Sequence, residues 1–127
     1  MTRKTQKHVG AGFSYVDVKL TYPVAEQVPI YMGVIGPKML TLSGEIADGT
    51  VGSVLAGTAY TRWARERIAE GMAKGGRTGH HRLAMFAMYA VDNDSAKAKQ
   101  AVRGMMAFYL HAVPKSAMTD VYGIGDE

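Results

Sequence analysis

The sequence predicts an α/β fold built on a parallel sheet, and three stretches of the chain carry that prediction. Val28–Leu55 runs in the order strand, tight turn, helix, turn and strand, with apolar runs at its two ends. Thr58–Lys74 has apolar residues at helical spacing. Leu83–Val91 is apolar without alternation, as expected of a parallel strand covered on both faces. Strands that alternate with helices in this way are typical of βαβ units.

The first of these stretches has clear punctuation. Val28–Ile35 is predicted as a strand, Pro37–Ala47 as a helix, and Thr50–Leu55 as a second strand. Pro37 suits the first helical position, because its missing N–H is one that a helix start leaves unpaired. Gly49 follows the helix, where a left-handed cap favours glycine. Gly44 costs about 1 kcal/mol relative to alanine inside a helix, so it predicts close packing of this helix on its strand.

The Gly36-Pro37 turn can bind an anion. Ligands of parallel α/β sheets lie beyond the carboxyl ends of the strands, and a glycine there lets a ligand approach the backbone. The following helix offers unpaired amides and the positive end of its dipole. The amides near Gly36, Lys38 and Met39 remain as donors, and the Lys38 side chain adds charge. An ordinary helix start explains the same residues, and the pattern alone leaves both interpretations open.

The amino-terminal 27 residues differ from the rest. Met1–Gly12 is polar, basic and glycine-containing, and it is predicted to be frayed. Phe13–Leu20 alternates and predicts a short strand or hairpin arm. Thr21–Gln27 contains a proline and is predicted as a loop.

The Thr58–Lys74 helix is amphipathic, with Thr58 or Thr61 as its expected cap. We expect ion pairs at spacing i,i+4 on its polar side, each worth about 0.3 kcal/mol. Trp63 is the sole tryptophan, and a packing role in the core or an interface is favoured over ring stacking with a ligand. The expected core residues are Tyr60, Ala64, Ile68 and Met72, and the expected pairs are Arg62 with Glu66 and Glu70 with Lys74.

The rest of the chain completes the α/β pattern. Lys74–Arg82 (KGGRTGHHR) does not match a phosphate-binding loop, so it is interpreted as a helix-to-strand connection. His80 and His81 are adjacent and would point to opposite sides of a strand, so no metal site is predicted. Asp92–Ser95 offers cap candidates for a helix that ends near Ala112 before Pro114. Its expected core residues are Ala98, Val102, Met105, Met106 and Tyr109, while Pro114–Glu127 is a short segment without an assigned element.

Composition narrows the class of protein. The chain has 127 residues, no cysteine and a net charge of +4 that is dispersed along it. Disulfides are therefore excluded, and the small charge excess does not predict nucleic-acid binding, which needs a cluster on one face. No run reaches the ~18 uninterrupted apolar residues that a membrane span needs. The amino-terminal charges are not followed by the apolar region of a signal peptide. A cytoplasmic location is the default expectation.

A longer pattern, PIYMGVIGPKMLTLSGEIADG at Pro29–Gly49, resembles the luciferase-like monooxygenase superfamily. It is most similar to the deazaflavin (coenzyme F420)-dependent branch related to methylenetetrahydromethanopterin reductase. The shared features are a proline-led strand, the Gly36-Pro37 turn, a glycine inside the helix, and Ala-Asp-Gly before the next strand. The similarity continues more loosely to Asp94.

The resemblance implies a (β/α)8 TIM barrel, of which this chain would hold about strands five to seven with their helices. A complete barrel needs about 250 residues, so we expect residues 28–127 to form a partial luciferase-like barrel domain and residues 1–27 an amino-terminal loop or hairpin segment. The resemblance also implies coenzyme F420, with FMN as the alternative, and a small organic substrate. In relatives the backbone that matches Ile35 and Gly36 contacts the coenzyme phosphate, and small residues that match Gly52 and Ser53 lie near it.

Two functions follow as expectations. The first is hydride transfer by an oxidoreductase of which this half binds the coenzyme phosphate, with the catalytic residues unknown because they lie mostly in the other half. The second is a catalytically inactive half barrel that acts by association with another chain, as a homo-oligomer or with a complementary half, because open sheet edges seek partners. A basic residue that some sugar-phosphate dehydrogenases of the family carry is absent, since Ala56 and Gly57 stand there. This absence argues against a phosphorylated sugar as substrate.

Overall fold

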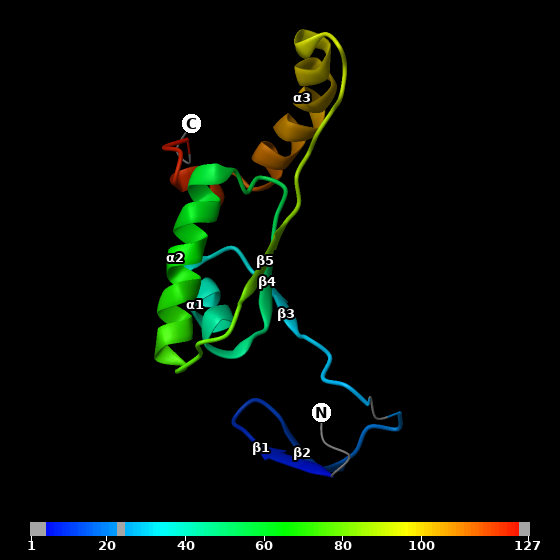
Figure 1. Ribbon diagram of the computed structural model, residues 1–127, viewed down its shortest axis with the longest axis vertical. Helices are drawn as coiled ribbons and strands as arrows, with labels where there is room; N and C mark the ends of the chain where they lie inside the picture. The colour runs from blue at the N-terminus through cyan, green and yellow to red at the C-terminus, as the bar shows by residue number, and fades with distance from the viewer. Residues whose placement is uncertain (1–4, 23–24, 125–127) are drawn as a thin grey trace.

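The computed structural model describes residues 5–22 and 25–124, shown in Figure 1. The described elements form a two-stranded hairpin, a three-stranded sheet and four helices. In chain order they are β1 (Gln6–Val9), β2 (Ser14–Val18), β3 (Tyr31–Gly33), α1 (Pro37–Ile46), β4 (Gly49–Gly52), α2 (Thr58–Lys74), β5 (Arg82–Met85), α3 (Ser95–Ala112) and α4 (Ala117–Asp120).

The three-stranded sheet has the order β3-β4-β5, and both of its pairs are parallel. Tyr31 pairs with Gly49, and Gly49 pairs with Arg82. This arrangement confirms the predicted βαβ units, although each strand is shorter than the apolar run that predicted it. In Figure 1, α1 and α2 lie on one side of this sheet, and no described helix lies on the other. The sheet therefore has one covered face and one open face.

Helix α1 begins as predicted and ends differently. Gly36 is its N-cap residue and Pro37 its first helical residue. At the other end, Ala47 closes the helix in an extended conformation, and its amide donates to the Ser43 carbonyl. The prediction of a left-handed cap at Gly49 was wrong, because Gly49 is already part of β4. A Cβ there would collide with the Tyr31 ring, so close approach of this side chain explains the glycine.

Two glycines let α1 and α2 cross at close range. A Cβ at Gly44 would collide with the carbonyl oxygen of Ile68, and one at Gly71 with that of Thr41. Gly44 therefore supports close packing as expected, but the partner is helix α2 rather than the strand. The periodicity of one helix could not reveal which neighbour its glycine faces.

The core lies between the two helices and α4. Its fully enclosed residues include the predicted face of α2, while Met72 is only partly buried. The sequence did not predict α4, from which Met118 enters the core with 2% of its surface exposed. The buried members of this cluster are Leu40, Tyr60, Ala64, Ile68 and Met118. Trp63 packs against the cluster and is partly buried, which agrees with the packing role expected for it.

The polar features of α2 differ from the prediction. Gly57 is its N-cap residue and no side chain of the first turn caps it, so the expected threonine cap was wrong. The Tyr122 hydroxyl instead accepts a hydrogen bond from the Ala59 amide at 3.1 Å. The expected i,i+4 ion pairs are absent from the described residues. The pairs found are Arg67 with Glu70 at 2.9 Å, Arg67 with Glu66 at 3.8 Å, and Lys74 with Glu45 of α1 at 2.7 Å.

The amino-terminal segment forms an antiparallel hairpin. β1 pairs with β2, so the prediction of a frayed Met1–Gly12 was wrong for residues 6–9, and residues 1–4 lie outside the described part. β2 falls inside the predicted strand, but all residues of both strands are exposed. His8 packs its ring on Phe13 and Tyr15, with centroids 5.0 and 5.5 Å apart. The predicted loop at Thr21–Gln27 lies partly outside the described residues.

Helix α3 and the segment before it extend away from the sheet in Figure 1. β5 ends at Met85, and Phe86, Tyr89 and Val91 are 63%, 84% and 90% exposed. The prediction of a strand through Val91 covered on both faces was therefore wrong. Asp94 caps α3 as predicted, since its side chain accepts from the Ala96 amide at 2.9 Å. No residue of α3 is buried, so its expected core face was also wrong.

Leu83 and Met85 of β5 pack against the core, whereas no residue from 86 to 112 is buried within the described chain. No helix in residues 5–22 and 25–124 is both long enough and apolar enough to cross a membrane.

Candidate functional site

The strand ends bring together the two backbone segments that the sequence singled out. The β3–β4 register pairs Gly33 with Val51, and the Val34 amide donates to the Val51 carbonyl at 3.3 Å. Ile35 and Ser53 each lie two residues beyond this last pair, so both follow the carboxyl ends of neighbouring strands. The Gly36 turn and the segment after β4 thus form one edge of the sheet, at its carboxyl end.

Gly36 has no structural reason within the described chain to be glycine. Its backbone has φ −87° and ψ 157°, an extended conformation that any residue adopts. A Cβ added there would meet no atom within 4 Å. The space in front of Gly36 is therefore open, as a site for close approach of a ligand requires.

Lys38 lies one residue inside α1 and is exposed. The first amides of a helix have no intrahelical partner, and no side chain caps those of α1. Lys38 therefore adds a positive charge at the positive end of the helix, beside the Gly36 turn.

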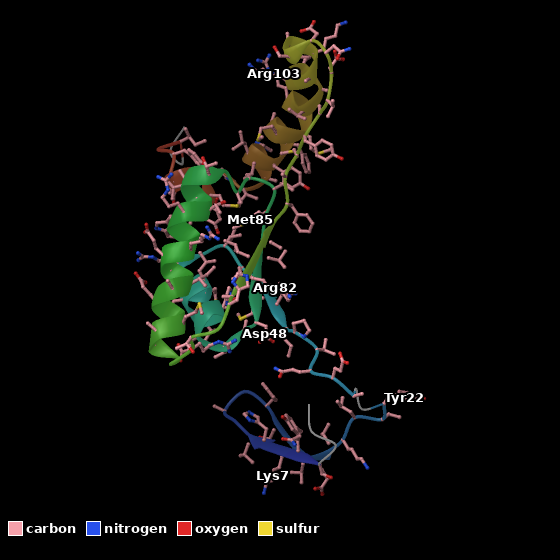
Figure 2. All side chains as sticks on the ribbon, viewed as in Figure 1. Lys7, Tyr22, Asp48, Arg82, Met85 and Arg103 are labelled. Atoms are coloured by element: carbon pink, nitrogen blue, oxygen red, sulfur yellow. The ribbon has the colours of Figure 1, made fainter. Side chains whose placement is uncertain are left out.

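The two predicted site residues of β4 differ from each other. Gly52 is buried, and a Cβ there would collide with the sulfur of Met85 in β5. Packing inside the chain therefore explains this glycine without a ligand. Ser53 is partly buried, and its carbonyl accepts a hydrogen bond from the Ala56 amide at 3.1 Å in the following turn. Figure 2 shows Met85 toward the carboxyl end of the sheet and Asp48 toward the opposite end.

Tyr60 contacts the turn from behind, and the sequence did not predict this contact. Its side chain is fully enclosed, and its hydroxyl donates to the Ile35 carbonyl at 2.8 Å. Burial raises the pKa of Tyr60 to about 12, so the hydroxyl remains a donor even in moderately alkaline solution. The helical spacing identified Tyr60 as a core residue only. The available signal was chemical, since a buried tyrosine hydroxyl usually finds a hydrogen-bond partner.

Two hollows flank this region. One of about 370 Å³ borders the Gly36 turn and contains the only tryptophan of the chain, with Gly36, Pro37, Trp63, Ala117, Asp120 and Val121 as its lining. The other, of about 390 Å³, is mainly apolar and lies between the segments that follow β4 and β5 and the helices α3 and α4. Both open to solvent beside the candidate site.

The opposite end of the sheet holds a polar chain with a structural role. The Thr50 hydroxyl lies 2.7 Å from the Ser43 hydroxyl and 2.9 Å from Nε2 of His81. Burial, and then the Arg77 charge, lower the pKa of His81. These groups tie α1, β4 and the start of β5 together.

Asp48 lies near this chain. It accepts hydrogen bonds from the Ile30 amide at 2.9 Å and from Arg77 at 3.4 Å. The bond from Ile30 is the largest cause of its lowered pKa. Across residues 5–22 and 25–124, no group of three or more His, Cys, Asp or Glu side chains could hold a metal ion.

Parallel βαβ units are the repeating unit of (β/α) barrels, a class of proteins whose ligand sites lie at the carboxyl ends of the strands. The family described as luciferase-like monooxygenase matches residues 2–124. The chain belongs to this family, and its fold is a partial luciferase-like (β/α)8 barrel.

Individual relatives within this family share one name. The chain is 36% identical over 113 residues to a 5,10-methylenetetrahydromethanopterin reductase of Methanolobus tindarius, covering 78% of this chain and 33% of the relative. It is 31% identical over 128 residues to the protein of the same name from Archaeoglobus fulgidus, covering 98% and 37%.

A solved structure agrees with these relatives. The coenzyme F420-dependent tetrahydromethanopterin reductase of Methanopyrus kandleri matches with a TM-score of 0.62 and 29% identity, over 76% of this chain and 28% of that one. The chain thus spans about a third of the length of the relatives that it matches.

Proposed function

We propose that this chain is part of an oxidoreductase that uses coenzyme F420 for hydride transfer to or from a small organic substrate, and that it holds the phosphate of the coenzyme. Relatives named for F420-dependent or pterin reduction support the coenzyme and a pterin-like substrate. The observation that carries the phosphate site is Gly36, whose backbone conformation and surroundings give no internal reason for a glycine. FMN is the alternative coenzyme within the same family. A cytoplasmic location belongs to the same proposal.

In this proposal, the phosphate lies in front of the Gly36 turn. The amides of Gly36 and Lys38 donate to it, and the Lys38 side chain balances part of its charge. Ile35 and Ser53 border the site through their backbone. Gly52 has only an indirect role, because it makes room for Met85. The coenzyme supplies the hydride chemistry when bound, while these residues bind and orient it.

A second candidate function rests on the open face of the sheet. Leu83 and Met85 of β5 pack against the core, so Ala84 between them and its register neighbour Gly33 of β3 face the other side, where both are exposed. With this face open, we propose as the alternative that the chain acts by pairing with a complementary half or with a second copy, without catalysis of its own. In either function, we propose residues 28–127 as the partial barrel domain and residues 1–27 as a separate segment. Sedimentation of the purified chain distinguishes a monomer from such an assembly.

The test of the phosphate site compares two glycine substitutions. Gly36→Ala places a methyl group where the phosphate would lie, and Gly79→Ala makes the same change in the connection between α2 and β5. A Cβ meets no atom within 4 Å at either position, so neither variant should unfold the chain. Losing one hydrogen bond to a charged group costs about 1.5–3 kcal/mol. Gly36→Ala should therefore weaken the affinity for coenzyme F420 by roughly 10- to 100-fold, while Gly79→Ala leaves it unchanged.

Isothermal titration with coenzyme F420 and with FMN measures this effect. Saturable binding of one of them, weakened only by Gly36→Ala, supports the proposal and identifies the coenzyme. A folded, homogeneous chain that binds neither would contradict it and would leave association as the remaining function.

A further inference from the structure

The Tyr60 hydroxyl makes one hydrogen bond within the described part of the chain, and that bond reaches the candidate phosphate site. The side chain comes from α2, is fully enclosed, and packs against Trp63 with ring centroids 5.6 Å apart. Its hydroxyl donates to the Ile35 carbonyl at 2.8 Å. The acceptor belongs to the peptide that joins Ile35 to Gly36, which also carries the amide proposed to bind phosphate.

The geometry of this peptide links the two groups. A trans peptide is planar, and its C=O and N–H point in opposite directions. The described chain has no cis peptide bonds. Because the Ile35 carbonyl points toward the Tyr60 hydroxyl, the Gly36 amide points the opposite way, away from Tyr60.

Such a peptide needs an anchor because glycine follows it. Glycine has few conformational restrictions, so rotation about the bonds that flank the peptide would turn the amide away from a ligand at little cost. A hydrogen bond to the carbonyl in a buried site opposes this rotation, since breaking it would leave a buried polar group unpaired. A tyrosine hydroxyl is protonated at neutral pH, so the donor proton is present.

We propose that Tyr60 is a positioning residue for the phosphate site, whose hydroxyl holds the Ile35 carbonyl and thereby aims the Gly36 amide at the anion. This inference rests on the proposed function. It explains why a residue of the α2 core face carries a hydroxyl group, and it makes the site depend on a helix that does not itself contact the ligand.

The chain offers a matched pair of variants for the test. Tyr60→Phe and Tyr122→Phe each keep the ring and remove one hydroxyl that bonds to backbone. The Tyr60 hydroxyl reaches the turn, whereas the Tyr122 hydroxyl accepts from the Ala59 amide at the start of α2. Tyr60→Phe fills the same space in the core, so it should fold.

The affinity for coenzyme F420 is the first readout. Tyr60→Phe should weaken it about tenfold, the equivalent of ~1.4 kcal/mol, and Tyr122→Phe should leave it within about twofold. The second readout is the amide resonance of Gly36 by NMR, with inorganic phosphate as the probe. Phosphate should shift this resonance in the parent chain and in Tyr122→Phe, and shift it much less in Tyr60→Phe.

The outcomes separate the two levels of the argument. A parent chain that binds coenzyme F420, with unchanged affinity in Tyr60→Phe or an equal loss in both variants, would overturn the positioning role alone. A folded parent chain that binds neither coenzyme F420 nor FMN and whose Gly36 amide ignores phosphate would overturn the proposed function, and the role of Tyr60 with it.

Discussion

The crossing of α1 and α2 predicts the effect of a single added methyl group. A Cβ at Gly71 would collide with the Thr41 carbonyl oxygen and lie 2.8 Å from the Thr41 carbonyl carbon and 3.0 Å from the Glu45 amide nitrogen. All three are backbone atoms of α1, so no side-chain rotation relieves the collision and the helices must separate. Overpacking of this kind costs about 1–3 kcal/mol.

Helix propensity acts in the opposite direction, and a matched variant removes it. Alanine is favoured over glycine inside a helix by about 1 kcal/mol. Gly104→Ala makes the same change inside α3, where a Cβ would meet no atom within 4 Å. The difference between Gly71→Ala and Gly104→Ala therefore isolates the collision, and we expect Gly71→Ala to be less stable by about 1–3 kcal/mol.

Urea unfolding followed by circular dichroism at 222 nm measures both variants. Gly71→Ala should lower the midpoint relative to the parent chain, and Gly104→Ala should keep or raise it. A Gly71→Ala variant as stable as Gly104→Ala would refute the close helix crossing as described.

Three further predictions concern the polar groups. Thr50→Val should lower the free energy of unfolding by about 1–3 kcal/mol in urea titrations, because Ser43 and His81 lose a buried partner; an unchanged value would mean that water replaces the hydroxyl. Because burial lowers the pKa of His81 below 6.5 in the folded state, the unfolded chain binds this proton first. Stability that is present above pH ~6.5 is then lost as the pH falls through the lower folded value. His81→Gln should flatten this part of the stability profile, and an unchanged slope would assign it to another group. Asp94→Ala should lower the helicity at 222 nm by removing the cap on the Ala96 amide, at a cost of about 1 kcal/mol; full retention would show that the cap is dispensable.

The sequence predicted an element well where residues close together in the chain determine it, as in a single helix or a single turn. The Gly36-Pro37 start of the first helix and the end of the second helix at Lys74 are as predicted. Strand lengths were overestimated, because an apolar run such as Leu83–Val91 reports a tendency to be buried and does not say where pairing ends. Only part of the candidate site could be predicted, because some of its residues depend on neighbours in other elements. The open backbone at Gly36 follows from a local pattern, whereas the packing role of Gly52 depends on Met85 in another strand.

The sequence by itself determined the α/β class, the order of the elements, the family and the turn that the proposed coenzyme site uses. These follow from short-range patterns, namely helical spacing, turn residues and a glycine-proline junction. Only the tertiary structure decided what each side chain meets. It paired Gly44 with the backbone of α2, moved the Lys74 ion pair to Glu45, and brought the Tyr60 hydroxyl to the Ile35 carbonyl. Such contacts join residues 24 to 29 positions apart, and spacing within one element carries no information about them.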